Sequence, residues 1–247
     1  MRFDFPYFWH LLFSTAFLQP AWTTFWVTLV AMSIGLTLGL LGALGATSRL
    51  AVLRSLIAGY LWLVRGTPLL VQIVFWYDAV AELTNNVINF PALVAGVIAL
   101  GINEGAYMTE IVRAGLLSVD PGQMEAARSL GMTYPLTMRR IVIPQAVRVI
   151  LPPTGNQFIG MLKTTSLLFT IAVPEIFAMG TNLYSVNFRY FEVLCVVSIW
   201  YLALTSILTV VQRRLERRVG LERARAGGAG VGLWSRTFGA GLAKHTR

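Results

Sequence analysis

The stretch Gln123–Pro153, QMEAARSLGMTYPLTMRRIVIPQAVRVILPP, is the longest polar interruption between hydrophobic segments of the chain. Met124 and the residues up to Leu130 can share one short helix. Gly131 is expected to end it, because glycine adopts the left-handed conformation that closes a helix at little cost. A basic run bounded by prolines follows. The stretch therefore predicts an exposed, rigid helical element between two membrane spans, and a solvated linker is the alternative interpretation.

The composition of the chain indicates a membrane protein. Its 247 residues are 56% hydrophobic and only 13% charged, and the mean hydropathy is +0.66, which is too apolar for an ordinary soluble domain. The net charge of +9 does not indicate nucleic acid, because the basic residues lie between and after hydrophobic segments and form no patch interleaved with exposed aromatic residues.

Five segments are long and apolar enough to cross a bilayer, since a spanning helix needs about 20 apolar residues. The expected fold class is an all-α membrane protein with about five transmembrane helices, at 21–48, 55–77, 90–111, 152–173 and 191–211, and Pro152-Pro153 is expected to begin the fourth. Residues 1–20 are rich in aromatic side chains and lack the pattern of a cleaved signal, so we expect an N-terminal interfacial segment. Residues 213–247 form a basic tail that we expect to be disordered.

The first expected span contains a stripe of small residues. Gly35, Gly39 and Gly42 recur at spacings of four and three. Such a stripe favours close approach of a neighbouring helix over a ligand site.

The basic residues predict the orientation of the chain in the membrane. Of the twenty basic residues, seven lie in the loops at 49–54 and 113–148, and nine lie after the fifth span. Segments enriched in lysine and arginine face the cytoplasm. The N-terminus is therefore expected outside, the C-terminus inside, and the polar stretch between spans three and four in the cytosol.

Three charged residues are expected near the middle of their spans. At 1.5 Å per residue, Arg65, Glu104 and Lys163 each lie about 15–20 Å from a span end. Charged groups at this depth pair with one another or mark a transport path. Arg65 either pairs with a carboxylate or accompanies backbone opened by the following Gly66 and Pro68. Glu104 either pairs with Arg65 or Lys163, or belongs to a translocation path.

Several strings of residues, taken in order, resemble a known family. Glu125-Ala126-Ala127, Gly131 and the later Pro144 resemble the EAA loop of ABC-transporter permeases, although Ile143 replaces the usual leucine before the proline. The chain further resembles the permeases of the polar amino acid uptake branch, of the histidine, glutamine and arginine type. That resemblance covers roughly residues 20 to 212 and rests on RGTPLLVQ at 65–72, EIVRAG at 110–115, PQA at 144–146, PP at 152–153 and KTTSL at 163–167.

The resemblance implies a transmembrane permease subunit of a binding-protein-dependent ABC importer for polar amino acids, multi-pass in a bacterial inner membrane. Residues 21–212 would form the permease domain, with a coupling loop at about 120–148. A cytosolic helix carrying Glu125, Ala126, Ala127 and Gly131 would dock on a separate ATPase subunit. The implied partners are two ABC ATPase subunits, a second permease subunit, identical or related, a periplasmic or extracellular amino acid-binding protein, the amino acid and membrane lipid.

The chain itself is not expected to be an enzyme. It lacks a G-x-x-x-x-G-K-[ST] stretch, so ATP hydrolysis is expected in the partner subunit. We expect no cofactor and no metal site, because the two histidines, His10 and His245, lie at opposite ends and Cys195 is the single cysteine.

The candidate substrate path follows from the chemistry of an amino acid. Its carboxylate needs a cationic or N–H partner and its ammonium an acidic or carbonyl partner, both shielded from bulk water. The same charged groups can instead form structural pairs with one another. The candidate path residues are Arg65, Asn103, Glu104, Lys163, Thr164 and Thr165.

Two other classes of function remain open at this stage. An ion-coupled secondary amino acid transporter would also carry ionisable residues in its spans, although such proteins usually have more spans in repeated halves. A membrane scaffold would use the polar loop for docking and would have no transport path.

Overall fold

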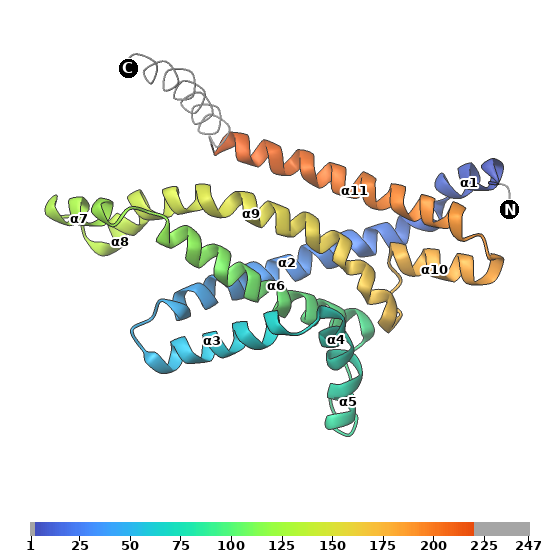
Figure 1. The fold of residues 1–247 in the computed structure, drawn as a ribbon, viewed down its shortest axis with the longest axis horizontal. Coiled ribbons are helices and arrows are strands. Elements are labelled where there is room, and N and C mark those ends of the chain that lie inside the picture. The colour runs from blue at the N-terminus through green and yellow to red at the C-terminus, as the bar shows by residue number, and fades with distance from the viewer. Residues whose placement is uncertain (1–2, 220–247) are drawn as a thin grey trace, which may run out of the picture.

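The computed structural model describes residues 3–219, and every regular element among them is helical (Figure 1). The expected all-α class is therefore confirmed. In chain order the elements are α1 (Phe5–Leu12), η1 (Thr15–Phe17), α2 (Leu18–Ala46), α3 (Ala51–Gly66), α4 (Leu69–Val74), η2 (Phe75–Ala79), α5 (Val80–Leu83), α6 (Ala92–Leu117), α7 (Pro121–Ser129), α8 (Tyr134–Thr137), η3 (Met138–Val142), α9 (Ile143–Thr164), η4 (Thr165–Ile171), α10 (Ile176–Asn187) and α11 (Tyr190–Arg218).

Three to five of these segments qualify as membrane spans. Three are long and apolar enough to cross alone: the continuous Thr15–Ala46, α6 and α11. Two more are bent pairs. Helix α3 meets the α4–α5 segment at 106°, and the segment from α8 to η4 meets α10 at 48°. The five expected spans correspond in order to α2, α3 with α4, α6, α9 with η4, and α11.

Helices α2 and α6 pack closely along the glycine stripe, at the centre of the bundle in Figure 1. A Cβ added at Gly35 would lie 2.6 Å from Glu104 Cγ, and one added at Gly39 would lie 2.9 Å from the carbonyl carbon of Met108. Glycines of α6 approach α2 in the same way, since a Cβ at Gly101 would lie 2.7 Å from Ile34 Cγ2. The sequence prediction of close helix approach is confirmed.

The other helices assemble around this pair. One buried cluster joins α2, α4, α6, α9 and η4, and its members include Val27, Ile73, Leu100, Met161 and Leu168. Helix α9 lies against α6, where a Cβ on Gly115 would meet the Ile150 side chain at 2.8 Å. Buried side chains from these five elements form one core around the α2–α6 pair.

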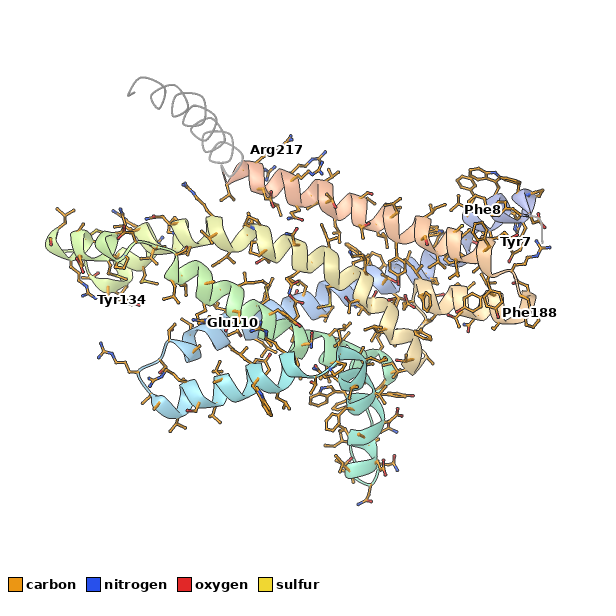
Figure 2. The ribbon with its side chains drawn as sticks, viewed as in Figure 1. Tyr7, Phe8, Glu110, Tyr134, Phe188 and Arg217 are labelled. Atoms are coloured by element: carbon orange, nitrogen blue, oxygen red, sulfur yellow. The ribbon has the colours of Figure 1, made fainter. Side chains whose placement is uncertain are left out.

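A polar cluster attaches α1 to the turn between α10 and α11. The Asp4 carboxylate accepts a hydrogen bond from the Tyr7 N–H at 3.0 Å and pairs with the Arg189 guanidinium. The Asp4 N–H donates to Glu192 Oε1 at 3.0 Å. The pKa of Asp4 is lowered, first by the Tyr7 N–H and then by Arg189. Figure 2 shows Tyr7 and Phe188 at this same end of the molecule.

The fourth span differs from the expectation. Pro152 and Pro153 were expected to begin it, but they lie inside α9, which starts at Ile143. The two prolines remove the backbone donors for the carbonyls of Arg148 and Val149, one turn earlier on the helix. Beside the prolines, the Gln212 side chain of α11 reaches Pro152 O at 3.4 Å, and the Thr154 hydroxyl donates to Ile150 O at 2.8 Å.

The C-terminal helix extends beyond the expected span. Helix α11 continues to Arg218, past residue 213, where the basic tail was expected to begin. Figure 2 shows Arg217 at its end. The remainder of that tail, from residue 220, lies outside the described residues.

Replacing Gly39 with alanine is expected to destabilise the bundle by about 1–3 kcal/mol, because the added methyl group meets backbone of α6 that cannot move aside. Unfolding of the purified protein in detergent, followed by titration with SDS, measures this loss. Gly59→Ala is the matched control, because no atom lies within 4 Å of a Cβ at Gly59. Equal stability of the two variants would contradict the packing argument.

Candidate functional site

The backbone between α3 and α4 is irregular and interrupts a candidate membrane span. Thr67 and Pro68 are extended, with φ/ψ of −116°/145° and −63°/136°. The sequence dictates this, since proline disfavours the helical conformation of the residue before it and lacks the N–H that would continue the helix. Non-helical backbone at this depth must find partners in the protein or in a wet cavity.

The side chain of Gln72 supplies those partners. Its amide nitrogen donates to Val64 O at 2.8 Å and to Thr67 Oγ1 at 2.8 Å. Its carbonyl oxygen accepts from Asn103 Nδ2 of α6 at 3.1 Å. Gln72 was not among the candidate site residues. The available signal was an amide side chain one turn after a glycine–proline break, where carbonyls lose their usual donors.

A polar pocket of about 450 Å³ opens beside this break. Thr67, Pro68 and Leu69 form one wall, and α6 contributes Asn103, Glu104 and Tyr107. Helix α9 contributes a third wall through residues spaced three or four apart, which share one face: Gln157, Gly160, Met161 and Thr164. Of the sequence candidates, the structure brings Asn103, Glu104 and Thr164 together here. Tyr107 and Gln157 join them and were not predicted.

Glu104 is the ionisable acid of this pocket. The residue is 5% exposed, and within residues 3–219 its Oε1 atom has no hydrogen-bond partner. A buried carboxyl oxygen without a donor is costly, so such atoms in folded proteins are normally satisfied by a partner. Glu104 therefore lines a cavity large enough for a small molecule, and its unpartnered Oε1 atom is buried in the wall of that cavity.

The other charged candidates lie elsewhere. The Arg65 guanidinium stacks over the Tyr107 ring, 5.6 Å from its centroid, on the exposed side of α3. Lys163 is exposed and lines a separate pocket of about 470 Å³ against α11. Among the described residues neither cation forms an ion pair with Glu104. Thr165 is buried, and its hydroxyl donates to Leu162 O at 2.8 Å.

The polar stretch forms the short helix α7, as predicted. Asp120 caps its N-terminus by accepting from the Gly122 N–H at 2.7 Å, and Pro121 occupies the first turn. Gly131 has φ +74°. At the C-terminal end, backbone N–H groups of Gly131 and Met132 donate to the carbonyls of Arg128 and Ala127 at 2.9 and 3.0 Å. This paired arrangement requires the left-handed residue.

The exposed face of α7 differs from the one the EAA pattern suggests. Glu125 and Ala126 are exposed, but Ala127 is buried beneath the α8–η3 segment that packs on α7. Leu130 is 82% exposed and follows directly on this helix. Figure 2 shows Tyr134 at the same far end of the molecule. The exposure of Leu130 was not predicted, because an apolar residue before a closing glycine is normally assigned to a core.

Replacing Gln72 with leucine is expected to cost about 1–3 kcal/mol of stability, because the carbonyl of Val64 loses its side-chain donor in a buried setting. Unfolding in detergent measures the effect. Gln145→Leu is the control, since the Gln145 amide donates only to Ile141 O, one turn back on its exposed helix face. A Gln72 variant as stable as the control would show that the break does not depend on this amide.

Comparisons with known proteins give one consistent family. Residues 35–221 match the model of the binding-protein-dependent transport system inner membrane component. The chain is 42% identical to the arginine transport system permease protein ArgU of Corynebacterium glutamicum over 219 residues, which are 83% of this chain and 69% of the relative. It is 34% identical to the glutamine transport system permease protein GlnP of Escherichia coli strain K12, covering 89% of this chain and 99% of that one.

Solved structures agree with these relatives. A crystal structure of an amino acid ABC transporter with histidines superposes with a TM-score of 0.80 at 38% identity, over 88% of this chain and 100% of that one. An inward-facing structure of the MetNI methionine ABC transporter superposes with a TM-score of 0.69 at 18% identity, over 88% of this chain and 99% of that one, and shares the fold. The family decides against the secondary transporter and the scaffold. The chain belongs to the binding-protein-dependent transport system inner membrane components, as the multi-pass permease subunit of an ABC amino acid importer whose ATPase is a separate subunit.

Proposed function

We propose that the polar pocket beside the α3–α4 break is the substrate site and that Glu104 binds the positively charged group of a polar amino acid. The observation that carries this proposal is the carboxyl group of Glu104, which lines the pocket and whose buried Oε1 atom has no partner in the described chain. A substrate ammonium or guanidinium would supply the missing donor. The attraction is strong there because the site is shielded from bulk water.

The remaining pocket groups suit the rest of an amino acid. Its carboxylate needs N–H or O–H donors, which the Gln157 amide and the Tyr107 hydroxyl can provide. Arg65 lies over the Tyr107 ring and adds positive charge at the pocket's margin. Asn103 and Thr164 complete the polar lining. Lys163 and Thr165 take no part in this site, because Lys163 lines another pocket and Thr165 is buried in the bundle.

The relatives support a substrate with donors on its side chain. One relative is named for arginine and another for glutamine. Both amino acids carry N–H groups that a carboxylate accepts. A pocket of about 450 Å³ has room for either.

The orientation and coupling of the chain are part of the same proposal. The N-terminus lies outside and the C-terminus in the cytoplasm, because the loops and tail that hold most basic residues mark the cytoplasmic side. Helix α7 then lies in the cytosol within the coupling loop 120–148. Its exposed Glu125 and Ala126 dock in a cationic groove of the ATPase, with Gly131 setting the turn. The buried Ala127 packs α7 against the α8–η3 segment.

The assembly contains more than this chain. Residues 1–20 lie at the membrane interface and 21–212 belong to the permease domain, whose last helix, α11, continues to Arg218. A few spans enclose no gated path alone, and α3 leaves large apolar side chains uncovered, among them Val52, Leu56 and Trp62. A second permease subunit, identical or related, completes the bundle. Two ATPase subunits and an amino acid-binding protein on the outer side complete the importer.

Replacing Glu104 with glutamine is expected to lower uptake of arginine by about 10–100-fold, which corresponds to losing one charge-assisted interaction. Uptake of labelled arginine into proteoliposomes that hold the permease with its ATPase and binding protein measures this. Glu82→Gln is the control, because Glu82 lies in the short α5 segment away from the pocket. Full uptake by Glu104→Gln, with unchanged protein abundance, would remove Glu104 from the site.

Replacing Glu125 with arginine is expected to abolish ATP-dependent uptake, because the exposed charge that meets the ATPase groove is reversed. Co-purification with the ATPase and uptake are measured together on the same preparation. Arg140→Glu reverses an exposed charge within the coupling loop but outside α7 and serves as the control. Retained coupling in Glu125→Arg would place the docking surface elsewhere.

A further inference from the structure

We propose that a groove between α9 and α11 binds one acyl chain of an anionic phospholipid from the cytoplasmic leaflet, with the phosphate of its headgroup on Arg148 and Arg214. The proposal rests on the orientation given above, which places the ends of these helices at the cytoplasmic surface. It concerns a site apart from the substrate pocket. The groove and the two arginines are independent observations, and the arginines lie at the cytoplasmic end of the groove.

The groove is apolar and lies on the side of the bundle where α11 runs along α9 (Figure 1). It encloses about 350 Å³. Phe25 and Leu29 of α2, Phe158 of α9 and Ile207 and Val211 of α11 line it. A second hollow of about 300 Å³ continues it along α2 and α11, because the two share Phe25, Ile207 and Leu208.

The combined groove is long enough for an acyl chain. On α11 it extends from Leu204 to Leu215, a rise of about 16 Å at 1.5 Å per residue. Its Leu204 end is lined by Leu18, Ala21 and Trp22 at the start of α2. A hydrocarbon chain that enters at Leu215 would run along α11 toward that end.

Two arginines stand at the end of the groove near Leu215. Arg148 precedes the lining residue Leu151 by three positions on α9, and Arg214 follows the lining residue Val211 by three on α11, so each shares a helix face with the groove. The Arg214 side chain leans toward the start of its helix, which is toward the groove. Both arginines are exposed and have no hydrogen-bond or ion-pair partner within residues 3–219.

The two arginine side chains at this end of the groove suit a phosphate ligand. The arginine fork binds phosphate oxygens through two parallel N–H donors. Basic residues at the cytoplasmic ends of spans bind anionic headgroups. The Gln212 side chain, packed against Gly155, closes the floor between α9 and α11.

Native mass spectrometry of the permease–ATPase complex in detergent, with equal amounts of dioleoyl phosphatidylglycerol and dioleoyl phosphatidylcholine, tests the site. The intact complex is expected to retain phosphatidylglycerol preferentially. The double variant Arg148→Gln/Arg214→Gln is expected to reduce that preference about 25-fold, since each arginine near an anionic headgroup contributes roughly a factor of five. Arg139→Gln/Arg140→Gln is the matched control and is expected to keep the preference.

A second variant tests the groove itself. Leu208 lines both hollows, so Leu208→Trp fills their junction and is expected to lower retention of both lipids. Unchanged phosphatidylglycerol retention in either variant, with unchanged thermal stability, would overturn the proposal. Disulfide formation between two copies carrying Ile207→Cys in a Cys195→Ser background would also overturn it, because a second copy would then cover the groove. Lipid retention is measured without substrate or ATP, so failure of the substrate site leaves this test intact.

Discussion

The close packing of α2 on α6 is the interaction on which the rest of the molecule depends. Without a hydrophobic driving force between helices in lipid, close packing supplies the attraction, and small residues permit it. At Gly35, Gly39 and Gly42 the approach of α6 leaves no room for a Cβ. The same contact positions the site, because Gly35 lies directly against the stem of Glu104. The carboxyl group is thereby held at 5% exposure beside a pocket. The face of α6 that packs on α2 therefore also carries Glu104, the acid of the candidate site.

The second constraint is the requirement that backbone groups in the membrane be satisfied. The break at Thr67 and Pro68 frees carbonyls that lipid cannot bind. The side-chain amide of Gln72 donates a hydrogen bond to the Val64 carbonyl, and its carbonyl oxygen accepts one from Asn103 Nδ2 on α6. This short network turns the chain by 106° and leaves polar walls on three sides of the pocket. The irregular backbone is thus the structural origin of the polar cavity.

Sequence reasoning reached the features that depend on local rules. The glycine stripe, the helix of the polar stretch and its closure at Gly131 follow from spacing and backbone conformation, and each is present. Counting residues predicts a similar depth for Arg65, Glu104 and Lys163, and that depth stays a prediction. Counting does not predict the direction in which each side chain points, because that depends on how helices rotate against their neighbours. In the structure the three residues lie on the exposed side of α3, at the polar pocket and against α11 respectively. The burial of Ala127 was missed for the same reason.

The measurement that tests the central claim most directly is uptake of a panel of labelled amino acids into proteoliposomes that contain this chain with its ATPase and binding protein. The account predicts uptake only when ATP is present on the ATPase side, with a polar amino acid preferred over apolar ones. Uptake that continues without ATP and follows a proton gradient would contradict it, because the chain would then transport substrate without the subunit to which α7 is proposed to couple.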